Sequence, residues 1–205
     1  YSGQMSKARE LAKRAVEEFK RAGKTGAASD NQALAALHEA LMGNLTIATR
    51  EVEEAVNLLK GEDPEAKYSQ ALSATIFGLA GDSAKATRLA DDLERRFPES
   101  TIMRFQYLPM VRGAAAMKSG NPTKAIEAFA VGERYELGAG TSIRLYRIYL
   151  RGLAYLAASQ GEQAAVEVGD VFEAPAPVGL RLVHRGEQAA QQIEGVRWAV
   201  TFLQQ

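Results

Sequence analysis

One alanine recurs along the chain at nearly constant intervals, and this recurrence limits the possible folds more than any other feature. Successive members are separated by 40, 38, 39 and 39 positions. They are Ala8, Ala48, Ala86, Ala125 and Ala164. The first four each follow a glycine by five residues. A period of this length, held over most of a chain, is typical of an array of helical hairpins.

The stretch from Tyr107 to Ala125 indicates how one hairpin is built. Its first part has the composition of a helix end, and residues 119–121 (Ser-Gly-Asn) form a turn. Asn121 is a favourable N-cap for the next helix. Pro122 suits the first turn of that helix, where its missing N–H is not needed. A small residue at Ala125 then lets the two helices approach closely, and a larger residue is expected to push them apart.

Apolar spacing predicts helices over most of residues 4–168. They are expected over residues 4–22, from Asp30 to Met42, between Asn44 and Gly61, from Pro64 to Ala80, from Asp82 to Phe97, as a hairpin over 101–136, over 142–159 and over 162–168. We expect a linker of small residues at 25–28, with Asp30 as the cap of the helix after it. Residues 137–140 are expected to form a loop.

The pattern changes after Val168, which divides the chain into a repeat array over residues 1–168 and a divergent tail over 169–205. Pro175 and Pro177 exclude a regular helix through their segment. Residues 187–203 again show helical spacing, which predicts a C-terminal capping helix. The alternative is a loosely ordered tail. At the other end, a first residue of Tyr1 instead of Met suggests a piece of a longer protein.

Composition excludes several classes of function. Lys plus Arg equals Asp plus Glu at 25 each, which argues against nucleic acid as the main partner. Cysteine is absent, and the two histidines, His38 and His184, have no paired spacing, so we expect no metal site and no cofactor. The glycines at 138 and 140 lack the pattern of a phosphate-binding loop. No apolar run approaches the roughly 20 residues of a membrane span.

The repeats resemble the tetratricopeptide (TPR) family. The residues that carry the resemblance are Gly152, Tyr155, Ala164 and Val168 in one repeat, Gly113, Ala125 and Phe129 in another, Ala74, Phe77, Ala86 and Pro98 in a third, and Ala36 and Ala48 in the weakest. Ala116 and Glu39 replace the family's aromatic residue. The period of about 39 exceeds the family's usual 34. The resemblance implies a right-handed solenoid of stacked antiparallel helix pairs.

Two longer strings, at residues 95–129 and 149–167, resemble the C-terminal repeat region of bacterial serine/threonine kinases of the Acidobacteria type. The chain has no His-Arg-Asp, no Asp-Phe-Gly and no Gly-rich loop leading to a Val-Ala-Ile-Lys strand. The resemblance therefore implies a sensing or recruiting region of a signalling protein and not an enzyme.

Three tyrosines follow the repeat period and are the strongest candidates for partner binding. Tyr68, Tyr107 and Tyr146 are 39 residues apart. By resemblance to the family, their position faces the concave groove, as do Met110 and Tyr149 three residues later. Tyrosine suits a groove because it combines a large apolar area with a polar tip. The alternative is that these side chains only pack between neighbouring helices.

Arginines form a second candidate set. Arg112 and Arg151 are also 39 residues apart, and Arg147 lies one turn before Arg151. Their guanidinium groups are suited to bind a carboxylate of a peptide. The interpretation that we favour is ion pairing between repeats, with carboxylates such as Glu127 and Glu133.

The sequence therefore predicts an all-α solenoid of about four to five hairpins that binds a peptide or partner protein in its concave groove. One alternative is an architectural module that self-associates through the ends of the solenoid. A less favoured one is an all-α enzyme with a buried carboxylate pair.

Overall fold

The computed structural model describes residues 5–59, 66–135 and 144–173, and these form helices without any strand. The α-helices are α1 (Met5–Arg21), α2 (Thr25–Leu41), α3 (Leu45–Leu58), α4 (Ala66–Ala80), α5 (Ser83–Arg96), α6 (Leu108–Lys118), α7 (Pro122–Ala130), α8 (Arg144–Ala157) and α9 (Gly161–Glu173). A π-helical turn η1 (Met103–Tyr107) leads directly into α6, and a short 3-10 helix η2 (Glu133–Tyr135) follows α7. The prediction of an all-α chain is confirmed.

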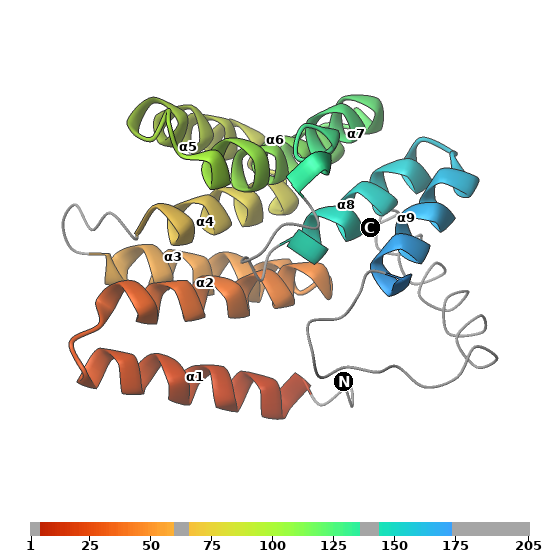
Figure 1. Ribbon diagram of the computed structural model, residues 1–205. Helices are drawn as coiled ribbons and strands as arrows, with labels where there is room; N and C mark the ends of the chain where they lie inside the picture. The colour runs from red at the N-terminus through yellow and green to blue at the C-terminus, as the bar shows by residue number, and fades with distance from the viewer. Residues whose placement is uncertain (1–4, 60–65, 136–143, 174–205) are drawn as a thin grey trace.

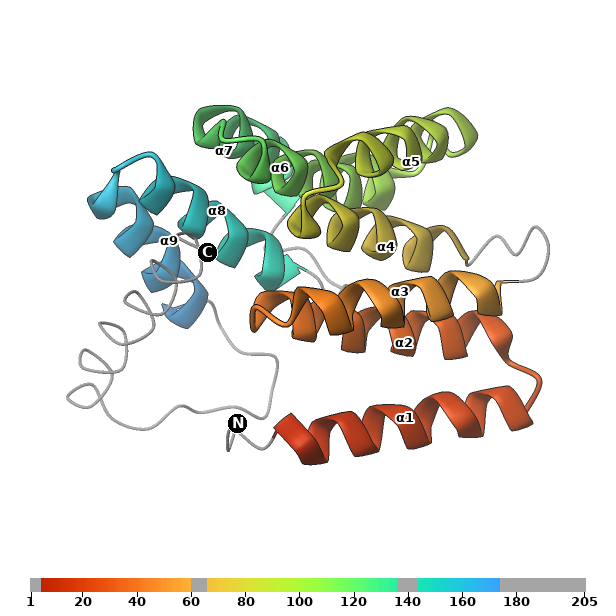
Figure 2. The ribbon, with the colours of Figure 1, turned by 180° about the vertical axis from the view of Figure 1, so that it is seen from behind.

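The helices form antiparallel pairs that pack side by side along the chain (Figure 1). We call α2, α4, α6 and α8 the first helices and α3, α5, α7 and α9 the second helices. Each first helix packs against its own second helix and against the next first helix. Each second helix from α3 to α7 also packs against the following first helix. The helix α1 has the place of a second helix, because it packs against α2 (Figure 2).

The recurring alanine has the same place in every second helix, which confirms the register derived from the sequence. Ala48, Ala86, Ala125 and Ala164 are each the fourth residue of their helix, and all four are buried. Each donates its backbone N–H to the residue four positions earlier. In α5 and α7 that earlier residue is also a side-chain cap: Asp82 accepts from the Lys85 N–H and Asn121 from the Lys124 N–H.

Two equivalent glycines, 39 residues apart, have different surroundings. A Cβ added to Gly113 of α6 would lie 2.3 Å from the nearest ring carbon of Phe129, which is fully buried in α7. A Cβ added to Gly152 of α8 would meet only the Cβ of Glu167, at 3.8 Å. Close packing therefore requires glycine in the hairpin of α6 and α7 but not in the hairpin of α8 and α9.

This difference predicts opposite outcomes for the same substitution. Gly113→Ala should lower the free energy of unfolding by about 1–2 kcal/mol, because the Phe129 ring has to move. Gly152→Ala should raise it by about 0.5–1 kcal/mol, because alanine favours a helix over glycine. Urea unfolding followed by circular dichroism measures both. Equal destabilisation by the two substitutions would contradict the packing described here.

The structure corrects three expectations about boundaries. Residues 25–28 are not a linker but the first turn of α2, where Gly26, Ala28 and Ser29 are buried and the Ser29 hydroxyl donates to the carbonyl of Ala55 at 2.7 Å. Asp30 consequently lies inside α2 and does not cap it. The helix α9 continues past Val168 to Glu173. The expected turns at Gly61 and Pro64, the loop at 137–140 and the capping helix at 187–203 lie outside the described residues.

Candidate functional site

The layer of first helices curves back on itself. His38, near the end of α2, and Tyr146, near the start of α8, are 108 residues apart, yet the His38 Nε2 and the Tyr146 hydroxyl are 2.5 Å apart. Their rings lie at a tilt of 56° with centroids 5.7 Å apart. Because α2 and α8 are the outermost first helices and their side chains meet, this layer is concave on the side that carries His38 and Tyr146.

Tyr68 of α4 and Tyr107 of η1 form a second aromatic pair in the layer of first helices. Their ring centroids are 5.2 Å apart, at a tilt of 32°. Asp30 precedes His38 by eight residues of α2, so the two side chains are about two turns apart along the helix and about 80° apart around it. The Asp30 carboxylate accepts a hydrogen bond from the hydroxyl of Ser69, the neighbour of Tyr68. Residues from α2, α4 and η1 thus form a compact aromatic and polar group. Together with the pair His38 and Tyr146, we call Asp30, Tyr68, Ser69 and Tyr107 the concave cluster.

Burial differs among the predicted groove residues. The side chains of Tyr68, Tyr146 and Tyr149 are half-buried, whereas Tyr107 is buried. Burial raises the pKa of the Tyr107 phenol, and the nearby Asp30 carboxylate and Tyr68 raise it further. Burial likewise raises the pKa of Tyr149. Both phenols therefore stay protonated at neutral pH and can donate hydrogen bonds.

Met110 does not belong to this surface, contrary to expectation. It is 0 % exposed and forms part of the core. The reason lies one turn earlier. In η1 the N–H of Leu108 bonds to the carbonyl of Met103, five residues back, and Pro109 has no N–H to donate. The sequence spacing of an ordinary α-helix therefore misjudges which side chains of α6 face inward.

Arg112 also departs from the groove prediction. Its guanidinium reaches α5, a second helix, where Nη2 lies 2.6 Å from Glu94 Oε2 and 3.6 Å from Asp91 Oδ1. All three side chains remain at least 43 % exposed. The favoured interpretation of ion pairing is correct in kind, although the partners are not Glu127 and Glu133.

The other two predicted arginines are buried and bind groups within the fold. Arg151 makes two hydrogen bonds with Glu167 of α9, at 2.8 and 2.7 Å. Arg147 donates to the carbonyls of Phe105 and Phe129, at 3.2 and 3.3 Å. The carbonyl of Phe105 is the one that residue 109 would bond to in an α-helix, and Pro109 leaves it available.

Three residues of the concave cluster are not among the predicted site residues, although the sequence contains a signal for two of them. Asp30 and Ser69 are 39 residues apart, the same interval as the tyrosines, so the period itself marks them. For His38 the sequence offers no signal, because its partner lies three hairpins away. Partial burial lowers the pKa of His38, and the negative charge of Glu39 opposes this change.

Glu39 of α2 forms a partly buried ion pair with α1. Its carboxylate is buried and binds the Arg9 guanidinium of α1 at 2.6 and 2.8 Å, and it also accepts from Asn44 at 2.8 Å. The hydrogen bond from Arg9 is the main reason that the pKa of Glu39 is lowered. This ion pair thus joins α1 to α2.

The concave cluster offers aromatic faces, hydroxyl groups and an imidazole. The described residues contain no group of His, Asp or Glu side chains able to hold a metal ion. Among the described helices, none combines the length and the apolar character that crossing a membrane requires. Comparison with family models, curated proteins and solved structures finds no match for this chain.

Proposed function

We propose that the chain is a protein-interaction module of the tetratricopeptide type, a right-handed solenoid whose concave face binds an extended segment of a partner protein. Two features of the fold support the repeat assignment. The pattern of packing between first and second helices repeats from one hairpin to the next. The recurring alanine is buried at the same place in four second helices.

The observation that carries the binding role is the placement of three half-buried tyrosines on the first helices. Tyr68, Tyr146 and Tyr149 leave part of each ring in contact with solvent, next to the polar pairs Asp30–Ser69 and His38–Tyr146. A ring held in this way loses little freedom when a ligand covers it, and tyrosines are therefore frequent in binding surfaces. A segment in extended conformation is narrow enough for a groove whose ends approach each other.

The kinase resemblance completes this proposal. As the repeat region of a larger bacterial signalling protein, such as a serine/threonine kinase, the module would sense or recruit a partner and carry out no catalysis itself.

The test begins with a ligand selected without prior assumption. Random peptides displayed on phage are panned against the folded chain, and an enriched peptide is labelled with fluorescein for anisotropy titration. We expect Tyr68→Ala and Tyr146→Ala each to weaken its binding by about tenfold or more, as for aromatic residues at the centre of an interface. Tyr107 is left unchanged, because truncating a buried ring would disturb the core.

Two controls accompany this titration. Arg88→Ala changes an exposed residue of α5, a second helix, and should leave the affinity unchanged. Tyr146→Phe keeps the ring and removes the hydroxyl that contacts His38, which separates stacking from hydrogen bonding. If no peptide is enriched, or if enriched peptides bind the alanine variants as tightly as the original chain, the concave face is not the binding surface.

Self-association remains a second candidate, because large apolar side chains are exposed on the first and last described helices. Leu11 of α1 is 51 % exposed and Val166 of α9 is 62 % exposed. Light scattering over a dilution series distinguishes the two functions: a mass that falls on dilution supports assembly, and a constant monomer mass excludes it.

A further inference from the structure

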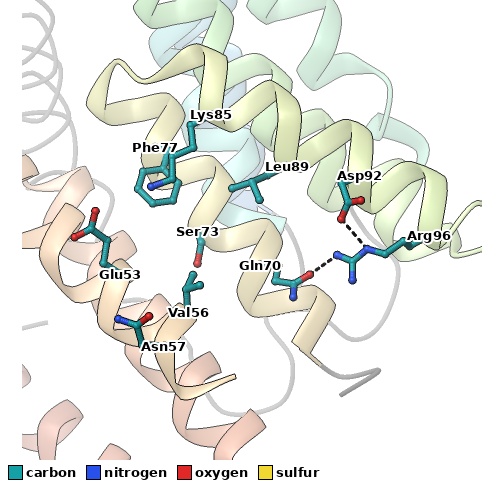
Figure 3. A pocket seen from close by; sticks show the side chains of 10 residues that line it. All are labelled: Glu53, Val56, Asn57, Gln70, Ser73, Phe77, Lys85, Leu89, Asp92 and Arg96. Atoms are coloured by element: carbon teal, nitrogen blue, oxygen red, sulfur yellow. Dashed lines mark hydrogen bonds and ion pairs between the residues drawn. The ribbon is translucent and has the colours of Figure 1, made fainter. Parts of the chain in front are cut away.

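A groove of about 570 Å³ opens between α3, α4 and α5, and its lining comes from all three helices (Figure 3). Phe77 and Ser73 of α4 are buried at its base. Val56 of α3, which is 39 % exposed, and Leu89 of α5 supply apolar walls. Its walls come from two consecutive second helices, α3 and α5, whereas the concave cluster involves first helices and η1.

The next hairpin contains a side chain where this groove is hollow. Ser73 of α4 is followed after 39 residues by Arg112 of α6. Arg112 lies against the preceding second helix, α5, where it pairs with Glu94 and Asp91. Ser73 is too short to reach α3, and its hydroxyl instead donates to the carbonyl of Ser69 at 2.7 Å. One repeat further on, an arginine at the equivalent position thus pairs with carboxylates of the preceding second helix.

The carboxylate that would receive such an arginine is present. Aligning α3 with α5 on their recurring alanines puts Glu53 at the position of Asp91, one of the two partners of Arg112. The Glu53 side chain is exposed and lines the groove. Within the three described ranges, no cation pairs with it.

The cations on the opposite wall already interact with other groups. Arg96 Nε lies 2.8 Å from Asp92 Oδ2, and Arg96 Nη2 donates to Gln70 Oε1 at 2.5 Å. The Lys85 Nζ lies 3.6 Å from the centroid of the Phe77 ring, a close cation–π contact. The α3 side of the groove therefore combines an unneutralised carboxylate with apolar surface, which favours a cationic ligand that has apolar neighbours.

We infer that this groove binds an arginine side chain presented by a segment of a partner protein. The guanidinium pairs with Glu53, as Arg112 does with α5, and the apolar residues beside the arginine pack on Val56 and Leu89. Arginine fits better than lysine because its planar guanidinium can donate two parallel hydrogen bonds to one carboxylate. This inference is independent of the concave face, and either site can be disproved alone.

The test uses a fluorescein-labelled peptide Leu-Ala-Arg-Ala-Leu and its twin with citrulline, which keeps the shape of arginine but has no charge. Anisotropy titration should show the arginine peptide binding about tenfold or more tightly than the citrulline peptide, as expected for a charged hydrogen bond. Glu53→Gln should remove this preference. Glu54→Gln, the matched control, changes an adjacent exposed carboxylate of α3 that faces Arg50 at 4.0 Å, and it should leave the preference unchanged.

A variant that supplies the arginine from within the chain completes the test. Ser73→Arg introduces into α4 the residue that α6 carries at the equivalent position, and it should pair with Glu53 and abolish peptide binding. Ser73 is buried, so Ser73→Arg also tests the tolerance of the core, and Glu53→Gln is decisive by itself. Equal binding of the two peptides, binding of neither, or a preference that persists in Glu53→Gln would each overturn the inference.

Discussion

Replacing Arg151 with methionine is expected to lower the free energy of unfolding by about 3–5 kcal/mol. The Arg151 and Glu167 side chains are only 4 % and 11 % exposed, and two hydrogen bonds join them. Methionine fills much of the same volume but leaves the Glu167 carboxylate without its cation in a poorly hydrated site. Chemical denaturation followed by circular dichroism measures the loss.

The chain supplies a matched control for this prediction. Arg112 has the same repeat position, but it and its partners are largely exposed, so Arg112→Met should cost at most about 1 kcal/mol. The double variant Arg151→Met/Glu167→Leu should recover most of the loss, because no buried charge remains. If Arg151→Met were no more harmful than Arg112→Met, the ion pair between α8 and α9 would not form as described.

The second large effect is expected at the recurring alanine. Ala125→Leu should lower the free energy of unfolding by about 3 kcal/mol, the upper end of the usual cost of adding carbon atoms to a filled core. Ala125 is 0 % exposed, and α7 packs against both α6 and α8, so the added carbons find no space without separating the helices. Thermal and urea unfolding both report this loss.

Ala8 provides the comparison. It is also the fourth residue of its helix and one period before Ala48, but in α1 it is exposed. Ala8→Leu should therefore change stability by no more than about 0.5 kcal/mol, as is usual for surface positions. Equal sensitivity at residues 8 and 125 would show that the period reflects helix formation alone and not close packing.

One repeat position carries serine, arginine and arginine in three successive first helices, and each has a different environment. Ser73 leaves a groove, Arg112 forms an exposed pair with the preceding second helix, and Arg151 forms a buried pair within its own hairpin. The backbone pattern is therefore conserved along the array, while the surface chemistry varies from hairpin to hairpin. Such variation gives each hairpin a different surface.

Much of the fold was predictable because its signals are local. The turn glycines Gly43, Gly81 and Gly120 all have positive φ, a backbone conformation that glycine adopts at little cost, and they separate the helices where expected. The expected helix over residues 4–22 and the one ending at Ala80 agree with α1 and α4. The prediction of a linker at residues 25–28 is wrong. Gly26 and Ala28 are small because they are buried in the first turn of α2, where larger side chains would prevent close packing.

The candidate site was less predictable because helix faces were assigned from a regular spacing. The π-helical turn before Pro109 changes the phase of α6, and Met110 consequently enters the core. The prediction of ion pairing is correct for Arg112 and Arg151, whose partners depend on which second helix lies within reach, whereas Arg147 donates to backbone carbonyls. The role of the tyrosines in binding a partner stays a prediction.

The sequence by itself determined that the chain is helical, where most helices begin and end, and which alanine lies between the helices of each pair. These properties depend on capping, turn conformation and apolar spacing within one hairpin. Only the tertiary structure decided that His38 meets Tyr146, that Arg151 and Glu167 are buried together, and that a groove opens beside Ser73. The contact between His38 and Tyr146 depends on curvature that accumulates over several hairpins, and the groove depends on how two neighbouring hairpins stack. The buried ion pair depends on which side chains α8 and α9 bring together when they pack, which helical spacing alone does not specify.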